Sequence, residues 1–309
     1  MEMRQLQALL AVADSGSVTR AAELLRIVQP AVTRQIHNLE TELGATLFER
    51  SRSGMRLTDV GASVAERARR ALNELDRARE EARSQGAGLH GIVTVGLLAS
   101  TSSLLAVPLV ERVMESHPGV RLRVVTGYAG HLSRGLESGD IDVAVTYNQP
   151  PAAALEVLPL LDEDLWAVAP PSEDSFPVPG VDLHHLLGMN LVMPSAPHGI
   201  RSLVESAAAR LGQPLQIAVE TNDAGVQAQL VEVGIGWTVL PGILAAQEAS
   251  SGVVLAAPIV NPAIPRRIVL ARPPSARSTA AVRMVADMLE RTILGKISSG
   301  QWPSARPVR

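Results

Sequence analysis

The sequence has no cysteine among its 309 residues. Disulfides, thiolate zinc sites and cysteine nucleophiles are therefore excluded. Long apolar runs are also missing: the best candidate, residues 231–244, is interrupted by Glu232 and Pro241 and is shorter than the roughly 18 residues of a membrane span. Three charged residues within the first fourteen positions interrupt any apolar segment of a signal peptide. We therefore expect a soluble, cytoplasmic protein with no membrane partner.

The composition is that of a folded chain with more than one domain. Hydrophobic residues make up 46% and charged residues 19% of the chain, which is enough apolar material for real cores. At roughly 100–200 residues per domain, the length fits two or three domains. The net charge of −3 gives no general attraction to nucleic acid, so any DNA-binding surface requires locally placed basic residues.

The first sixty residues have the apolar spacing of three short helices. The expected apolar stripes are positions 6, 9, 10 and 13, then 21, 22, 24 and 25, then 32, 36, 39 and 43. Residues 15–17 separate the first two helices, and Pro30 suits the first turn of the third. Gly44 is a candidate to end that helix.

Four polar residues, Gln29, Thr33, Arg34 and His37, project from the opposite face of the third helix, near its N-terminal end. Helix-turn-helix proteins place their base contacts at this end. Arginine, glutamine and threonine can contact guanine, adenine and thymine edges. A solvated polar face is the alternative for one helix alone, but the preceding helix, the tight turn and the segment that follows favour DNA binding.

The segment after Gly44 predicts a two-stranded wing with a turn at residues 51–54. Arg50, Arg52 and Arg56 lie around it, where they suit phosphates or a narrow minor groove. Residues up to position 58 include seven arginines and six acidic residues, a net charge of only +1. Any positive surface of this region therefore depends on where the arginines lie.

A long helix is predicted from Thr58-Asp59, which can cap it, to about residue 83. Its apolar residues at 64, 68, 71, 75, 78 and 82 are spaced by four and three, as in a heptad seam. A helix packed on its own domain is the alternative. Dimerisation is favoured because it lets the helical N-terminal domains of two chains bind a near-palindromic DNA site together. The glycine-rich residues 84–91 predict a hinge.

The remainder of the chain alternates strands and helices. Strands are expected at 92–96, 120–126, 141–145, 165–169, 191–193, 216–220, 236–240 and 267–271, and helices at 104–116, 131–137 and 279–293. This rhythm predicts mostly parallel sheets with helices on both faces. Two such lobes form a cleft at the carboxyl ends of their strands, where ligands bind.

Four hydroxyl residues, Ser100, Thr101, Ser102 and Ser103, follow the first of these strands at the expected start of a helix. Free backbone N–H groups and the helix dipole favour an anion there. Ordinary helix capping explains the same residues equally well when they are taken alone.

No catalytic motif is recognisable. The sequence lacks a G-x-S-x-G elbow, a P-loop and an H-E-x-x-H motif, and Gly234-Ile235-Gly236 lacks the third glycine of a dinucleotide fingerprint. His184-His185 have no carboxylate or histidine at metal-ligand spacing, and residues 162–164 have the pattern of a surface charge run. We expect no enzymatic activity, no cofactor and no bound metal.

The segment VTRAAELLRIVQPAVTRQIHNLETELGATLFERSRSGMRLTDVG resembles the DNA-binding signature of LysR-type transcriptional regulators, nearly unbroken from about residue 4 to 61. The segments HPGVRLRVVTG and HLSRGLESGDIDVAV, and later residues 233–240, resemble that family's effector domain more loosely. The resemblance therefore covers essentially the whole chain.

The resemblance implies a dimer of dimers that is paired through the linker helix and bound to double-stranded promoter DNA with dyad symmetry. It also implies a two-lobed α/β effector domain resembling periplasmic binding proteins. A pocket between the lobes would hold a small-molecule effector, an organic acid or another metabolite.

The resemblance also carries site residues over by motif position. DNA contacts fall on Gln29, Pro30, Thr33, Arg34, Arg50 and Arg52, beside the His37 and Arg56 proposed above. The effector pocket falls near Ser100, Thr101, Tyr147, His198 and Thr221, with Ser102 from the helix start and Gly199 from the run at 197–201.

We predict an N-terminal all-α winged helix-turn-helix at 1–58, a dimerisation helix at 59–83, a hinge at 84–91 and an α/β effector domain at 92–309. Lobe I comprises residues 92–161 and 266–309, and lobe II comprises residues 162–265. The predicted function is sequence-specific DNA binding controlled by a small molecule. The alternative is a cytosolic solute-binding module whose helical head binds another protein.

Overall fold

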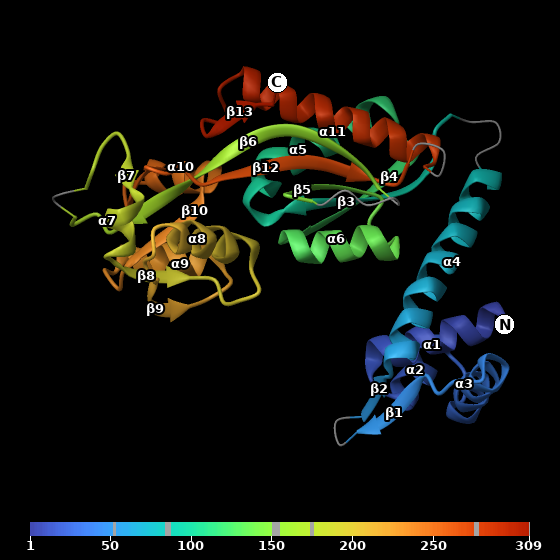
Figure 1. The fold of residues 1–309 in the computed structure, drawn as a ribbon. Helices are drawn as coiled ribbons and strands as arrows, with labels where there is room; N and C mark the ends of the chain where they lie inside the picture. The colour runs from blue at the N-terminus through green and yellow to red at the C-terminus, as the bar shows by residue number, and fades with distance from the viewer. Residues whose placement is uncertain (52–53, 84–87, 150–154, 174–175, 275–277, 309) are drawn as a thin grey trace. The chain divides into compact units, whose positions relative to one another are not determined.

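A computed structural model of the protein describes residues 1–51, 54–83, 88–149, 155–173, 176–274 and 278–308 (Figure 1). The chain forms two compact units, one of residues 1–91 and 137–140 and one of residues 92–136 and 141–309. The predicted hinge lies partly outside the described residues, because 84–87 are not among them, and Arg52 of the predicted wing also lies outside.

The first unit is a small helical domain with one hairpin. Its elements are α1 (Met3–Ser15), α2 (Val18–Leu25), α3 (Gln29–Leu43), β1 (Phe48–Ser51), β2 (Gly54–Leu57) and α4 (Asp59–Arg83). Gly16 and Gly44 adopt left-handed conformations, with φ of 65° and 64°, that end α1 and α3. Ser17 Oγ accepts the Arg20 N–H at 3.4 Å and begins α2. The three predicted helices are confirmed.

The core of the first unit is formed by the predicted apolar stripes, with two corrections. Leu9, Val32 and Leu39 are fully buried at the centre of the unit. Leu24 is 68% exposed because the short α2 buries a narrow face made of its two alanines, and Leu24 lies outside that face. Leu43, in the last turn of α3, is 40% exposed.

The hairpin β1–β2 is the predicted wing, paired antiparallel from Phe48 opposite Leu57. It is also bonded to the turn between α1 and α2, because Met55 N donates to Gly16 O at 2.9 Å. A Cβ added at Gly54 would lie 2.5 Å from the same oxygen, so this close approach requires glycine. The wing is therefore held on the helical domain by backbone contacts.

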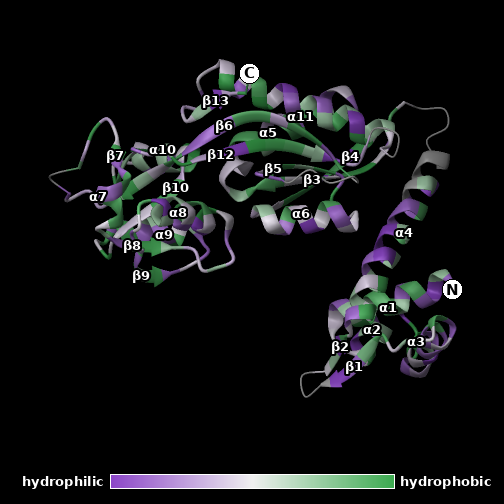
Figure 2. Cartoon of the chain, viewed as in Figure 1, coloured by the Kyte–Doolittle hydropathy of each residue, from purple (hydrophilic) through white to green (hydrophobic). Residues whose placement is uncertain are grey.

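Helix α4 is largely hydrophilic (Figure 2). Thr58 Oγ1 accepts a backbone N–H in its first turn, as predicted. Its apolar seam divides into two parts: Val64 and Ala68 pack against the core of the first unit, whereas Ala71 and Leu75 are exposed. The part of the seam that is free for a partner is thus shorter than the heptad pattern predicts.

The second unit is an α/β domain that begins at β3 (Gly91–Leu98). It continues with α5 (Ala99–Ser116), β4 (Val120–Gly127), α6 (Ala129–Ser138), β5 (Val143–Tyr147), β6 (Glu156–Ala169), β7 (Val181–Asp182), α7 (Leu183–Leu187), β8 (Asn190–Met193), α8 (Gly199–Arg210) and β9 (Gln216–Glu220). It ends with α9 (Ala224–Glu232), β10 (Trp237–Pro241), α10 (Gly242–Ser250), β11 (Leu255–Val260), β12 (Pro265–Arg272), α11 (Ala280–Ser298) and β13 (Ala305–Pro307).

The strands follow the order β4-β3-β5-β12-β6-β10-β8-β9, with β7, β11 and β13 off this path. Strand β3 is parallel to β5, and β8 is parallel to both β9 and β10. The prediction of a mostly parallel arrangement is wrong at the centre, where β12 is antiparallel to β5 and β6, and β6 is antiparallel to β10. The reason is visible in Figure 1: the long β6 and its neighbour β12 carry the chain between the two halves in opposite directions.

Element boundaries differ from the predicted ones where strands continue between the halves. Strand β6 begins at Glu156, well before the predicted position 165, and both predicted lobe boundaries fall inside β6 and β12. Helix α5 begins at Ala99, so Ser100 and Ser103 lie inside its first turns rather than before it. In the described part of the chain, no helix is long and apolar enough to cross a membrane.

Candidate functional site

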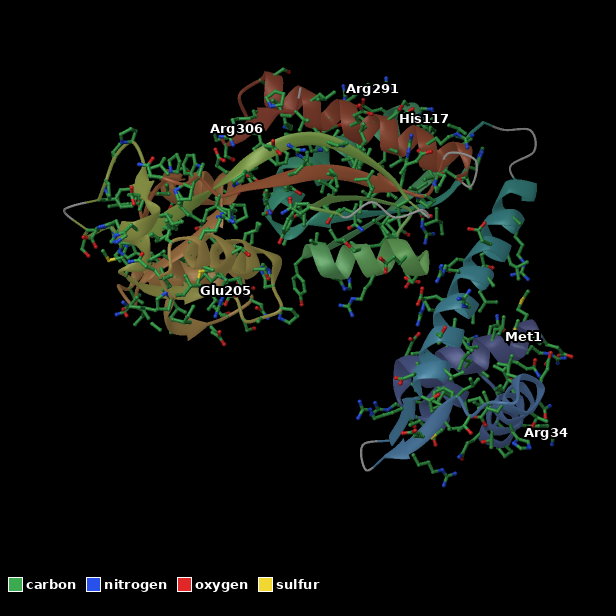
Figure 3. All side chains as sticks on the ribbon, in the orientation of Figure 1. Met1, Arg34, His117, Glu205, Arg291 and Arg306 are labelled. Atoms are coloured by element: carbon green, nitrogen blue, oxygen red, sulfur yellow. The ribbon has the colours of Figure 1, made fainter. Side chains whose placement is uncertain are left out.

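The exposed face of α3 presents the predicted DNA-contact residues. Gln29, Pro30, Thr33, Arg34 and His37 are all exposed at the N-terminal part of this helix (Arg34 is labelled in Figure 3). Thr33 Oγ1 donates to Gln29 O at 3.2 Å. The described residues provide no hydrogen-bond or ion-pair partner for the side chains of Arg34 and His37. Both are therefore free to bind an external partner.

The wing presents its described arginines on opposite faces. Arg50 is paired with Met55 and Arg56 with Glu49. Side chains of successive residues alternate between the faces of a ribbon, so Arg50 and Arg56 point to opposite sides. The predicted cluster therefore separates into Arg50 on one face and Arg56, beside Glu49, on the other. Both arginines are exposed.

A surface hollow of about 530 Å³ lies between the wing and the start of α2. Ser17, Arg20, Arg50 and Met55 are among the residues that line it. Arg20 was missed by the sequence analysis, although its place in the first turn after the Ser17 cap was a usable signal. Two arginines beside a helix N-terminus form a positively polarised surface that suits a phosphate.

The second unit contains a cavity of about 440 Å³, within the usual range for small-molecule sites. Its walls come from the carboxyl ends of β3, β4, β5 and β10 and from the residues after β8 and β9. Parallel strands and the helices that follow them place loops and helix starts at this edge. The cavity lies where the sequence predicts a ligand cleft.

An ion pair between Arg266 of β12 and Glu163 of β6 lies behind the cavity wall. Arg266 lines the cavity, and its Nε and Nη2 donate to Glu163 Oε2 at 2.8 and 2.6 Å. Arg266 Nη2 also donates to Ser100 Oγ at 2.9 Å. Glu163 Oε1 accepts three further bonds, from the Trp302 indole, the Ser304 hydroxyl and a backbone N–H of α10. Each of the two buried charges is thus neutralised by the other.

Tyr147, at the end of β5, lines the cavity with a side chain that is 6% exposed. Burial raises the pKa of its hydroxyl, opposed by the charge of Arg266 and by the Ile200 N–H. The Ile200 N–H lies near both side chains, but its hydrogen bond goes to His198 Nδ1 at 3.3 Å, so Tyr147 Oη has no partner in hydrogen-bond geometry among the described residues. Gly199 makes room for the ring, since a Cβ there would lie 2.2 Å from Oη.

His198 caps α8, and its ring lies beside that of a second tyrosine of the cavity, at a tilt of 57°. Its Nδ1 accepts the Ile200 N–H, and its ring centroid lies 5.5 Å from that of Tyr128. Burial, and secondly the charge of Arg266, lower the pKa of His198. The cavity therefore contains a neutral imidazole at neutral pH.

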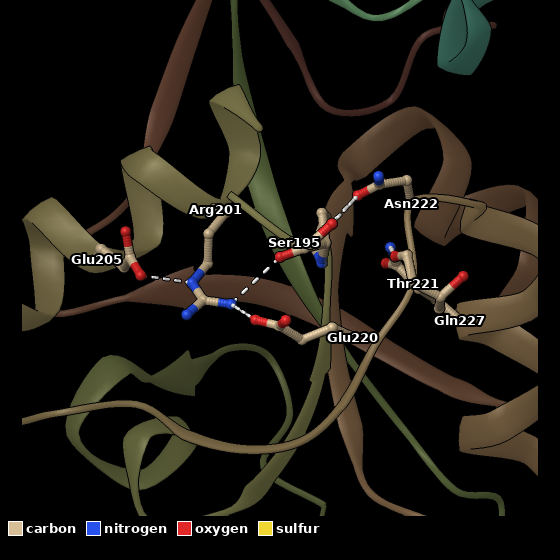
Figure 4. Close-up of polar contacts among 8 residues, drawn as sticks. Ser195, Arg201, Glu205, Glu220, Thr221, Asn222 and Gln227 are labelled. Carbon is tan, nitrogen blue, oxygen red and sulfur yellow. Dashed lines mark hydrogen bonds and ion pairs between the residues drawn. The ribbon is translucent and has the colours of Figure 1, made fainter. Parts of the chain in front are cut away.

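The loop after β8 is held at the cavity rim by polar contacts (Figure 4). Arg201 Nη1 donates to Pro194 O at 3.2 Å and pairs with Glu220 at 3.0 Å, while its Nε pairs with Glu205 at 2.6 Å. Asn222 Oδ1 accepts bonds from the backbone and hydroxyl of Ser195 at 3.0 and 3.1 Å. These contacts fix Pro194 and Asn222, which both line the cavity.

A second rim contact joins the loop after β9 to β10. Gln227 Nε2 donates to Thr221 O at 2.8 Å, and Gln227 Oε1 accepts the Thr238 hydroxyl at 3.1 Å. Gln227 is nearly fully buried and lines the cavity. This part of the wall is therefore also fixed before any ligand binds.

The structure brings three of the predicted effector residues, Ser100, Tyr147 and His198, to the cavity wall. The hydroxyls of Thr101 and Ser102 instead donate to backbone carbonyls of their own helix start. Gly199 lies behind Tyr147, and Thr221 precedes the lining residues. The sequence analysis missed several wall residues, namely Tyr128, Asn222, Asp223, Gln227 and Arg266.

The described residues offer no cluster of three or more histidine, aspartate or glutamate side chains that could hold a metal ion. His184 and His185 have other neighbours: His184 Nε2 lies 3.2 Å from Gln213 Nε2, and His185 packs against Trp237. These two histidines are accounted for by local packing.

Comparison with known families matches both units. Residues 3–62 match the family described as bacterial regulatory helix-turn-helix protein, lysR family, and residues 86–293 match the LysR substrate binding domain. The nitrogen assimilation regulatory protein nac of Klebsiella aerogenes is 32% identical over 242 residues, which cover 78% of each chain. The transcriptional regulator BbuR of Bordetella bronchiseptica is 28% identical over 292 residues, covering 94% of this chain and 90% of that one.

Solved structures share the fold along the whole chain. A full-length OxyR variant from Pseudomonas aeruginosa superimposes with a TM-score of 0.71 at 24% identity, covering 99% of this chain and 97% of that one. Full-length CbnR, solved in complex with its target DNA, gives a TM-score of 0.66 at 23% identity, covering 94% and 100%. At these identities the likeness shows the fold alone.

Proposed function

Because the chain belongs to the LysR family of bacterial transcriptional regulators, we propose that it binds a specific promoter sequence under the control of a small molecule held in the 440 Å³ cavity. The observation that supports this most directly is the coexistence in one chain of an exposed polar face on α3, with Arg34 free, and a preformed pocket. Its DNA partner lies in the bacterial cytoplasm, so we place the protein there too. Nothing in the described residues suggests a catalytic role.

We propose that α3 reads the base sequence in the major groove. Arg34 and Gln29 have the donors and acceptors for guanine and adenine edges, and both are exposed near the start of the helix. Pro30, Thr33 and His37 complete the contact face. These residues would supply the sequence preference, since contacts to phosphates fix position but carry no sequence information.

We propose that phosphates are bound beside α3. Arg20 and Arg50 line the hollow at the start of α2 and would bind one phosphate, and Arg56, on the other face of the wing, would bind another. Arg52 belongs to the same proposal by sequence position. Each arginine that neutralises a phosphate adds to the salt dependence of binding.

We propose that α4 pairs two chains into a dimer and that dimers associate into a tetramer. The exposed Ala71 and Leu75 support the first step, because an alanine-rich seam permits close helix packing. Two heads held in this way match a site with dyad symmetry.

A binding experiment on the full-length protein tests the proposal. Fluorescence anisotropy would compare the DNA upstream of the native gene with a shuffled fragment of equal composition, at several salt concentrations. We expect salt-dependent binding with a preference of about 10³-fold or more for the native fragment. Equal affinity for both fragments at micromolar protein would contradict sequence-specific regulation.

A further inference from the structure

The cation in the cavity wall is already neutralised by the protein. Arg266 is the guanidinium that an anionic ligand would seek, yet its Nε and Nη2 are bonded to Glu163, which is fully buried. Glu163 is surrounded by hydrogen-bond donors on both oxygens, as an ionised carboxylate requires. Glu163 therefore already provides the negative charge that a bound anion would otherwise provide to Arg266.

Three of the helix starts around the cavity each have a backbone N–H bonded to a side chain of the protein. Backbone N–H groups in the first turns of α8, α9 and α10 donate to His198, Asp223 and Glu163, respectively. Helix N-termini attract anions because these N–H groups are unpaired. One such N–H in each of these three helices is bonded to a side chain of the protein itself, whereas α5 begins at the cavity without a side-chain cap.

The other described residues that line the cavity supply no positive charge. Leu98, Val239, Leu240 and Leu244 provide apolar surface, and Asp223 adds a negative charge at the rim. Burial keeps the imidazole of His198 neutral, because its pKa is lowered. A carboxylate placed in this cavity would lose its hydration without gaining an unpaired cation in return.

One buried polar atom does point to a ligand. Tyr147 lines the cavity with a side chain that is only 6% exposed, and its buried Oη, beside Gly199, has no hydrogen-bond partner among the described residues. A buried hydroxyl without a partner is unfavourable, and one neutral oxygen or nitrogen of a ligand would satisfy it.

We infer that the cavity selects an uncharged, mainly apolar small molecule that carries a carbonyl, amide or hydroxyl group bonded to Tyr147 Oη. This inference rests on the proposed function, and it names the chemical class of the effector. It favours a neutral metabolite over an organic acid. The internal Glu163–Arg266 pair is the feature that discriminates between the two classes.

Matched pairs of probes test the inference on the full-length protein. Benzamide with benzoate, cinnamamide with cinnamate, and hexanamide with hexanoate have nearly the same shape and differ in charge at neutral pH. Isothermal titration would measure the Kd of each probe, with thermal shift as a second readout. We expect the amide of each pair to bind about ten-fold more tightly, or more, because the carboxylate must lose its hydration.

Variants identify the side chains that determine the preference for amides over carboxylates. Tyr147→Phe removes the unpaired hydroxyl and should weaken amide binding about five- to ten-fold. Tyr128→Phe removes a hydroxyl from a half-exposed side chain and should weaken it less, because water can replace that contact. Glu163→Gln removes the internal anion and should shift the preference toward the carboxylates, whereas Asp162→Asn, on the exposed side of the same strand, should not.

If Glu163→Gln does not fold, the test uses the wild-type protein alone: the Kd of each amide and each carboxylate is measured at several salt concentrations. Amide binding should be unchanged by added salt, because it involves no net charge. Tighter binding of the carboxylates to the wild-type protein would overturn the inference while leaving an effector pocket in place. Failure of every probe to bind would count against the pocket itself, and with it against both the proposed control by a small molecule and the inference.

Discussion

Glu163 and Arg266 form an ion pair at 2.6 Å although their side chains are only 0% and 2% exposed. The pair joins β6 to β12, the two strands that connect the halves of the second unit. It also reaches the cavity through Ser100, whose hydroxyl accepts a bond from Arg266. One buried pair therefore contributes both to the stability of this unit and to the charge of its cavity.

Removal of the cation should strongly destabilise the second unit. Arg266→Met leaves Glu163 as an unpaired buried carboxylate, and we expect the free energy of unfolding to fall by about 3–5 kcal/mol. All three tryptophans lie in this unit, so their fluorescence during urea unfolding reports on it specifically. The matched control is Arg267→Met, whose partner Asp162 is reached by solvent. Equal urea midpoints for the two variants would contradict the assigned role of the pair.

The absence of a side chain at position 199 is needed for the position of Tyr147. In Gly199→Ala the new Cβ would meet Tyr147 Oη at 2.2 Å, so the ring must move. We expect a loss of about 1–3 kcal/mol, seen as a lower Tm, together with weaker probe binding. Gly130→Ala, where a Cβ meets nothing within 4 Å, is the control and should leave Tm unchanged or slightly raised. A normal Tm in Gly199→Ala would mean that the ring is not confined.

Acidification should destabilise the second unit partly through His198. Burial and the charge of Arg266 lower its pKa from 6.5, so between the folded pKa and pH 6.5 the unfolded chain binds more protons than the folded one. The stability from neutral His198 is complete above about pH 6.5 and is lost as the pH falls toward the folded pKa. His198→Asn keeps a capping oxygen, and its Tm should fall less than that of wild type between about pH 7.5 and pH 5.5. The exposed-histidine variant His184→Asn should behave like wild type.

Much of the first unit could be predicted from the sequence because its signals are local. Gly16, Gly44 and Pro30 mark helix ends, and apolar spacing identifies the buried faces of α1 and α3. The sequence alone did not show that Arg50 and Arg56 lie on opposite faces of the wing, because this depends on which residues pair across the hairpin. The exposure of Leu24 likewise depends on how much of α2 its neighbours cover.

The location of the cavity could be predicted from the sequence, but the charge of its wall could not. Ser100 follows the first strand of the second unit, which is a local signal, whereas Tyr147 and His198 were expected there only from the family resemblance. Arg266 and Glu163 are 103 positions apart, and they meet only because β12 pairs with β6. The hydroxyl-rich start of α5 predicts an anion, and nothing in that local pattern indicates the Glu163–Arg266 pair beside it. Charge balance in a cavity is a property of the tertiary fold.

The two faces of the wing should contribute differently to DNA binding. Arg50 lies in the hollow with Arg20 and the start of α2, so Arg50→Ala should reduce the slope of log K against log salt by about 0.9. Arg56→Ala, on the face shared with Glu49, should change the slope less. Anisotropy titrations at several salt concentrations measure both slopes. Identical slopes would place both arginines at the same distance from the phosphates.

The exposed part of the α4 seam should determine self-association. Ala71→Glu places a charge on the proposed contact line, and we expect it to shift the protein toward smaller species on dilution. Ala62→Glu introduces the same change on the opposite side of the helix, where it should have little effect. Size-exclusion chromatography with light scattering distinguishes the species. Unchanged mass in Ala71→Glu would show that α4 is not the dimer contact.

The measurement that tests the central claim most directly is DNA affinity of the Arg34→Ala protein. We expect its Kd for the native upstream fragment to rise about ten-fold or more, while binding to the shuffled fragment and Tm stay close to wild type. Arg121→Ala, an exposed arginine of the second unit, is the control and should bind both fragments as wild type does. If Arg34→Ala retains the full preference for the native fragment, α3 does not read the sequence, and a head that binds another protein becomes the better account.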